Sequence, residues 1–182
     1  MNINLGNLKF VKALEHPELV APAVLEGLQK LPDNALVGAA AIDANLSDTA
    51  KFCEEYRVGM EQAANCVILE AKRGEKTWFA ACVVLGSTRA DVNGVARRTL
   101  DARKVSFAPM ERAVAETKME YGGISPIGLP SDWPILVDKA VADSGYVIIG
   151  SGIRGSKLAV PGSLFATLPH AQIIEGLAQV RL

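Results

Sequence analysis

The most constraining feature of this sequence is a pair of β-rich apolar runs joined by a short polar connector. The first run, NCVILEAK, begins at Asn65, and the second, TWFAACVVL, ends at Leu85. The connector between them, Arg73-Gly74-Glu75-Lys76, contains a glycine that can adopt the backbone conformation of a tight turn. Two such runs around a glycine-bearing connector are typical of a β-hairpin. The pattern therefore predicts an antiparallel strand pair in the middle of the chain.

Segments with helical spacing alternate with short apolar runs on both sides of this hairpin. Spacing and capping residues predict helices over about 17–30, from about 48 to 57, over 90–100 and for about ten residues after Pro109. Apolar runs bounded by turn residues predict strands near 35–43, 104–108, 135–138, 146–150 and 157–161, then a brief helix over 161–168 and a last apolar run around 173–180. Helices interspersed with strands indicate a mixed α+β or α/β fold.

Length and charge narrow the class of protein. The 182 residues can bury a core without metals or disulfides, and we expect one domain over 34–182 with an N-terminal helical extension over 1–33. The 19 Lys and Arg nearly balance the 20 Asp and Glu, which gives a formal net charge of −1. This balance removes the strongest sequence argument for a nucleic-acid-binding protein but leaves room for a local basic face.

Cysteine and histidine are scarce in this chain. The three cysteines (Cys53, Cys66 and Cys82) are widely spaced, and the two histidines (His16 and His170) lie near opposite ends of the chain. No zinc or disulfide framework fits this spacing, and we expect no cofactor. No secretory signal is evident, and apolar runs of about eight residues are far shorter than the ~20 that cross a bilayer. We therefore expect a cytoplasmic protein without a membrane partner.

Two short motifs resemble cofactor-binding or catalytic signatures. The stretch from Gly150 to Gly155 matches G-x-G-x-x-G, but the following SKLAV is strand-like, whereas a dinucleotide site requires a helix there. Ser125 lies in G-I-S-P-I-G, which has one residue too many for a nucleophile elbow. We interpret the first motif as a tight turn between strands and expect neither a dinucleotide-dependent oxidoreductase nor a serine hydrolase triad.

Positively charged residues cluster around 97–104 and at the hairpin connector. Arg97, Arg98, Arg103 and Lys104 can contact phosphates or simply form a solvated face with Asp101 as a partner. Trp78, beside the connector, can stack on a base or lie as a cross-strand aromatic on the surface. Sequence alone leaves both pairs of alternatives open.

A loop rich in glycine and proline follows the fourth predicted helix. The segment YGGISPIGLPSDWP, residues 121–134, contains three glycines and three prolines and therefore excludes regular structure. Adjacent glycines allow backbone to approach a ligand closely, and Pro126 stiffens the loop. The segment is either a ligand-binding loop or a long connector.

Three phrases around this loop resemble one protein family. They are GGISPIGLP at 122–130, PILVD at 134–138 and YVIIGSGIRGSKLAVPGSL at 146–164, and the similarity extends over about 35–182. The chain resembles the YbaK and ProX family, free-standing relatives of the editing domain of bacterial prolyl-tRNA synthetases. The resemblance implies an α+β fold whose mixed, largely antiparallel central sheet is flanked by helices. It also implies a trans-acting aminoacyl-tRNA deacylase, with aminoacyl-tRNA and an aminoacyl-tRNA synthetase as expected partners.

The same resemblance implies a set of site residues. Those expected to act in catalysis are Asn65, Gly122, Gly123 and Ser125, and those expected to bind substrate are Pro126, Gly150, Ser151, Gly152, Arg154 and Lys157. The chain departs from the family at two of these positions, because Asn65 stands where relatives carry Lys, and Lys157 where some carry Asp. Either Lys157 returns the missing positive charge, or the protein is a non-catalytic binding module that has kept the pocket but lost the chemistry.

Overall fold

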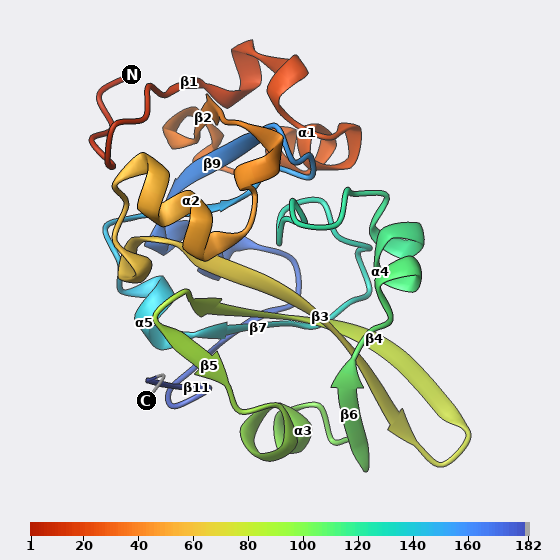
Figure 1. The fold of residues 1–182 in the computed structure, drawn as a ribbon. Coiled ribbons are helices and arrows are strands. Elements are labelled where there is room, and N and C mark those ends of the chain that lie inside the picture. The colour runs from red at the N-terminus through yellow and green to blue at the C-terminus, as the bar shows by residue number, and fades with distance from the viewer. Residues whose placement is uncertain (181–182) are drawn as a thin grey trace.

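The computed structural model describes residues 1–180 and shows a mixed α+β fold (Figure 1). The strands are β1 (Val11–Lys12), β2 (Gly38–Ala41), β3 (Ala64–Arg73), β4 (Lys76–Leu85), β5 (Thr88–Ala90), β6 (Lys104–Phe107), β7 (Ile135–Asp138), β8 (Tyr146–Gly150), β9 (Ser156–Pro161), β10 (Ala171–Ile174) and β11 (Ala178–Val180). The α-helices are α1 (Pro22–Gln29), α2 (Thr49–Tyr56), α3 (Arg97–Thr99), α4 (Met110–Thr117) and α5 (Lys139–Ala142). The α+β class is therefore confirmed.

Within residues 1–180 the strands divide among separate sheets. The larger sheet has the order β10-β7-β4-β3-β6, with β10, β7 and β4 parallel and the other pairs antiparallel. A four-stranded sheet, β1-β2-β9-β8, is wholly antiparallel, and β5 pairs with β11 in a two-stranded ribbon. A parallel bridge between Ala63 and Ile148 brings the two larger sheets together. The mixed central sheet that we expected corresponds to the five-stranded sheet, and the four-stranded antiparallel sheet adjoins it.

The four-stranded sheet buries apolar side chains on both faces. Along β8 and β9, Ile149 and Leu158 pack into the same cluster as Val24 of α1, whereas Ile148 and Ala159 pack with Phe52 of α2 and its neighbours. Residues 1–33, expected as an extension, contribute Val24 and Leu28 to this core, and both are fully buried. Residues 181–182 of the expected domain lie outside the described residues.

The predicted hairpin is confirmed, with β3 and β4 paired from Ala64–Leu85 to Arg73–Lys76. It projects from the body of the molecule (Figure 1). The helix from Asp48 is also confirmed: the Asp48 carboxylate accepts hydrogen bonds from the backbone N–H groups of Ala50 and Lys51, which caps α2.

Two predicted helices are shorter than expected. Over 17–30, a 3₁₀ turn spans Pro17–Leu19 and α1 begins only at Pro22, because the residue before a proline, here Ala21, avoids the helical conformation. Over 90–100, the chain first pairs Thr88–Ala90 with β11, then forms a π-helical turn over Val92–Ala96 before α3. The pairing with β11 is a long-range contact that local spacing does not reveal.

Cys66 and Cys82 lie in the strands of the hairpin, and burial raises the pKa of both thiols, that of Cys82 to about 12. They remain protonated at neutral pH and are poor nucleophiles. Nowhere in residues 1–180 do three or more His, Cys, Asp or Glu side chains gather as a metal site would require. No helix in the same part of the chain is long and apolar enough to cross a membrane.

Candidate functional site

A cavity of about 460 Å³ lies where the N-terminus of α2, the start of β3, α4 and the loop at 121–134, here called the glycine loop, meet. Its walls are Ser47, Asp48, Thr49, Ala64, Asn65, Cys66, Val67, Ile68, Phe107, Ala108, Ala113, Tyr121, Gly122, Ile124, Gly150, Arg154 and Lys157. Five of the ten residues expected in the site line it: Asn65, Gly122, Gly150, Arg154 and Lys157. They come from three separate segments of the chain, namely β3, the 121–134 loop and the β8–β9 region, so their convergence is a result of the tertiary fold.

Lys157 provides a buried cation in the cavity wall. It lies on β9, paired with Gly150 of β8 on one side and Ala40 of β2 on the other, and is only 8% exposed. Its Nζ donates a hydrogen bond to the Ser47 carbonyl oxygen at 3.0 Å and lies 5.4 Å from the centre of the Phe52 ring. Burial lowers the pKa of this amine to about 8. Within residues 1–180 no carboxylate forms an ion pair with it, so its charge is available to a ligand.

Asn65 presents an oriented amide to the same cavity. Its Oδ1 accepts a hydrogen bond from the Thr49 hydroxyl at 2.5 Å. The Asn65 NH₂ group bonds to no other residue in the described part of the chain, so it can donate to a ligand. Asn65 and Lys157 thus offer a neutral and a charged donor to one space.

The glycine loop lies directly against the turn that joins β8 and β9. Gly150 permits this approach, because a Cβ there would lie 2.4 Å from the carbonyl oxygens of both Gly123 and Ile124. The Gly152 N–H donates to the Gly123 oxygen at 2.7 Å, which holds the two segments together. Gly122 has φ +86°, a conformation that favours glycine, and forms part of the cavity wall.

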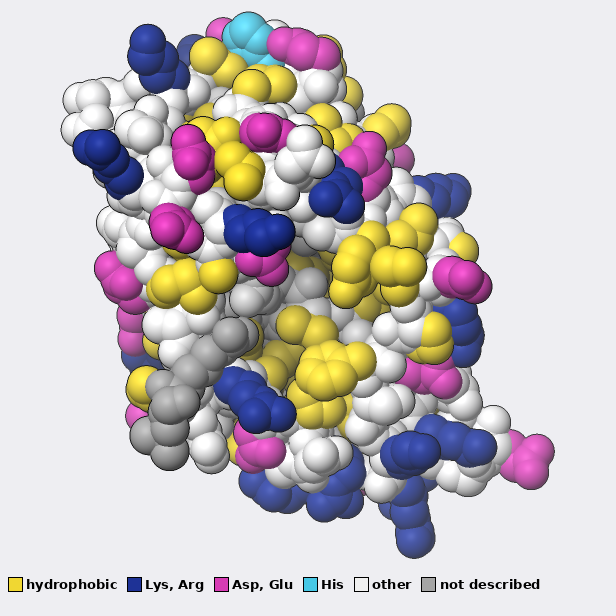
Figure 2. Space-filling view, viewed as in Figure 1, with side chains coloured by type: hydrophobic (Ala, Val, Ile, Leu, Met, Phe, Trp, Pro, Cys, Tyr) yellow, Lys and Arg dark blue, Asp and Glu magenta, His cyan; other side chains and the backbone are white. Residues whose placement is uncertain are grey.

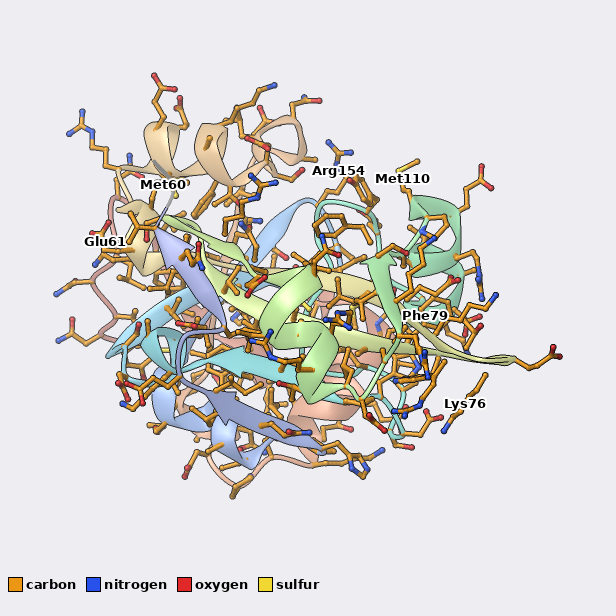
Figure 3. All side chains as sticks on the ribbon, turned by 90° about the horizontal axis from the view of Figure 1, so that it is seen from below. Met60, Glu61, Lys76, Phe79, Met110 and Arg154 are labelled. Carbon is orange, nitrogen blue, oxygen red and sulfur yellow. The ribbon has the colours of Figure 1, made fainter. Side chains whose placement is uncertain are left out.

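Arg154 lies exposed at the rim of the cavity, where Figure 3 shows its side chain at the surface on the same side of the molecule as Met110. Its guanidinium donates from Nε and Nη2 to the Ala44 carbonyl oxygen at 3.3 and 3.2 Å. Its backbone N–H donates to the Glu120 carboxylate at 2.8 Å. These contacts hold one cation at the entrance, and no carboxylate of residues 1–180 forms an ion pair with its side chain.

The other five expected residues lie outside the cavity wall. Ser125 is fully buried, and its hydroxyl accepts the N–H of Ile127, so it stabilises the loop internally. Ser151 is also fully buried, with its hydroxyl 2.7 Å from that of Ser156. Gly123 and Gly152 pack against neighbouring backbone and side chains. Pro126 lines a different cavity of about 490 Å³ between α1, α4 and the 126–131 segment.

Twelve of the cavity residues were not expected in the site, among them Ser47, Asp48, Thr49, Phe107 and Tyr121. Ser47 and Asp48 were recognisable only as capping residues for a helix, and Phe107 only as the end of a short strand. Phe107 and Tyr121 are nevertheless 64% and 56% exposed, which is unusual for aromatic side chains. The signal that distinguishes these two aromatic side chains is their exposure, which the sequence does not display.

The 150–155 turn connects two antiparallel strands, and no helix follows it. The geometry that a dinucleotide pyrophosphate requires at a helix N-terminus is therefore missing from this segment.

The cavity as a whole can bind a carbonyl oxygen that develops negative charge, because the Lys157 cation and the Asn65 amide donor both line it.

Comparison with known proteins finds a matching family model and a similar protein. The model of the aminoacyl-tRNA editing domain family matches residues 43–168, which is more than half of the chain. A protein of Enterococcus faecalis (strain ATCC 700802 / V583), named as a candidate Cys-tRNA(Pro)/Cys-tRNA(Cys) deacylase EbsC, is 24% identical over 102 residues. That match covers 56% of this chain and 62% of the relative, so it spans less than two thirds of the relative's length.

Two solved structures share the fold. One, described as a candidate trans-editing enzyme for prolyl-tRNA synthetase, has a TM-score of 0.69 at 16% identity, covering 86% of this chain and 97% of the other. The second comes from work on grafting linear epitopes onto scaffold proteins and has a TM-score of 0.70 at 18% identity, with the same coverage. Both similarities show that this chain has the same fold as these two structures.

Proposed function

The chain belongs to the aminoacyl-tRNA editing domain family, and we propose that it hydrolyses the ester bond of mischarged aminoacyl-tRNA in trans. The observation that carries the proposal is the buried Lys157 cation in a cavity that also presents the Asn65 amide. This arrangement favours the deacylase over a binding module that has lost the chemistry, because Lys157 supplies the charge that Asn65 lacks. The name of the E. faecalis relative supports the same substrate class.

In the proposed reaction, the aminoacyl group enters the cavity with its ester carbonyl oxygen toward Lys157 and Asn65. A water oxygen adds to the carbonyl carbon, and negative charge accumulates on the carbonyl oxygen. Donors that are already in place stabilise this charge more than they stabilise the neutral ester. The bond to the ribose oxygen then breaks as the carbonyl re-forms, the ribose oxygen takes the proton that the water has lost, and the products are a free amino acid and uncharged tRNA.

We further propose that Arg154, at the rim, contacts a phosphate near the tRNA 3′ end, since guanidinium groups bind phosphate oxygens well. Asn65 would act by positioning the ester rather than by charge. An aminoacyl-tRNA synthetase is a second proposed partner, because mischarged tRNA leaves such an enzyme. The proposed activity takes place in the cytoplasm, where tRNA is charged.

The direct test is deacylation of a panel of mischarged tRNAs by the purified protein, including alanyl- and cysteinyl-tRNA for proline. We expect multiple turnovers on at least one member and little hydrolysis of correctly charged prolyl-tRNA. Hydrolysis no faster than in buffer across the whole panel would rule out the proposed activity.

The pH dependence of the reaction provides a separate prediction. Because the Lys157 pKa is lowered to about 8, the charged amine predominates below this pH and is lost as the pH rises through it. After subtraction of spontaneous ester hydrolysis, kcat/KM is expected to fall by about half near pH 8 and roughly tenfold by pH 9. An activity that increases steadily from pH 7 to 9 would instead indicate a deprotonated group as the active species.

A further inference from the structure

Basic residues are unevenly distributed along this chain. The segment 72–104 holds eight Lys and Arg against three Asp and Glu, whereas the rest of the chain holds eleven against seventeen. The net charge of −1 therefore conceals a strongly basic segment in an otherwise acidic protein.

The fold gathers much of this charge at the free end of the β3–β4 hairpin. Lys72 on β3 pairs directly with Lys104 on β6, and the Arg103 N–H donates to the Lys72 carbonyl oxygen at 2.9 Å. Lys76 begins β4 across the turn, and Figure 3 shows its side chain near the projecting tip. Dark-blue side chains gather over this end of the molecule in Figure 2. We call the exposed residues Lys72, Lys76, Arg103 and Lys104 the hairpin basic surface.

The hairpin basic surface is not neutralised within the protein. In the described residues, no carboxylate forms an ion pair with any of its four members, whereas the neighbouring Arg73 is paired with Asp101. Like charges placed directly opposite on adjacent strands, as in Lys72 and Lys104, are destabilising. An anionic partner would remove this repulsion.

The surface is also connected to the cavity by one strand. Phe107, at one end of β6, lines the cavity, and Lys104 begins the same strand at the basic end. Three residues of extended chain span roughly 10 Å. The hairpin basic surface is therefore close enough for a nucleic acid whose terminal ester occupies the cavity to reach it.

We propose that the hairpin basic surface binds the phosphate backbone of the tRNA acceptor end, an inference that rests on the proposed function. Phosphates in a nucleic-acid strand follow one another every ~3.4 Å, so several lie along a surface of this size. The contact is electrostatic and independent of base sequence. It adds affinity for tRNA as such, while the cavity selects the aminoacyl group.

The test compares a double variant, Lys72→Gln with Lys104→Gln, with a control of equal charge change, Lys12→Gln with Lys30→Gln. The control lysines are exposed and lie elsewhere on the surface. Binding of uncharged tRNA is measured by fluorescence anisotropy across a salt series. The hairpin variant should bind more weakly, with a plot of log K against log salt less steep by about 2, while the control matches wild type. Thermal unfolding should show both variants folded.

Deacylation kinetics separate this inference from the proposed function. If wild type deacylates tRNA, the hairpin variant should have a raised KM and an unchanged kcat. Equal Kd, salt slope and KM for wild type and hairpin variant would overturn the inference and leave the deacylase intact. Increased self-association of the variant without weaker tRNA binding would also overturn it, because lysines on the edge strand β6 would then serve only to prevent strand pairing. Loss of tRNA binding without any wild-type deacylation would support the surface and refute the activity.

Discussion

Replacing Lys157 with methionine is expected to lower kcat/KM for deacylation by roughly 10²–10³-fold without destabilising the protein. Activity falls because the cavity loses the cation that faces the ester carbonyl oxygen. Methionine has a similar length, is apolar and adapts to irregular space, so it can fill the volume. The measurement is steady-state deacylation together with urea unfolding of the same preparations.

The Lys157→Met variant is expected to keep at least the unfolding free energy of wild type, because burying the charged Lys157 amine raises the free energy of the folded wild-type protein. A pKa lowered from 10.5 to about 8 corresponds to about 3 kcal/mol disfavouring the charged amine in the folded protein. Between these two pH values the unfolded state binds more protons at this position, so the Lys157 contribution to stability rises with pH. The difference in unfolding free energy between Lys157→Met and wild type should therefore shrink as the pH rises from 8 to 10.5.

Two further variants make the Lys157 result specific. Lys51→Met removes an exposed lysine from α2 and should leave activity unchanged. Adding Asn65→Lys to Lys157→Met moves the cation to another wall of the same cavity and should recover part of the lost activity. Full activity in Lys157→Met alone would show that this lysine has only a structural role.

Replacing Gly150 with alanine is expected to have the second largest effect, on both stability and activity. The new methyl group would lie 2.4 Å from the carbonyl oxygens of Gly123 and Ile124, so the glycine loop must move away from the β8–β9 turn. Such overpacking typically costs about 1–3 kcal/mol. Because Gly122 in the displaced loop forms a cavity wall, we also expect kcat/KM to fall at least tenfold under conditions where the variant is fully folded.

Gly155→Ala is the matched control for Gly150→Ala. Gly155 lies in the same turn, but a Cβ there meets no atom within 4 Å, so stability and activity should stay close to wild type. Equal behaviour of the two variants would contradict the close packing of loop and turn. Circular dichroism and thermal unfolding, measured beside deacylation, distinguish a displaced loop from global unfolding.

The sequence by itself determined the elements whose causes are local. The β3–β4 hairpin follows from two β-rich runs around a glycine-bearing connector, and α2 begins where Asp48 caps it. The glycines and prolines of 121–134 excluded regular structure, and no helix or strand lies within those residues. These features depend on contacts between residues near one another in the chain, so their pattern can be read directly.

Only the tertiary structure decided which side chains share the cavity. Ser125 and Ser151 are polar residues in glycine-rich segments, yet both are buried and satisfied by internal hydrogen bonds. The family resemblance pointed to Lys157, but only the fold covers it with Ser47 and Phe52 and lowers its pKa. Burial and proximity arise from packing between segments distant in sequence, and desolvation, which creates the chemistry of Lys157, exists only once that packing has formed.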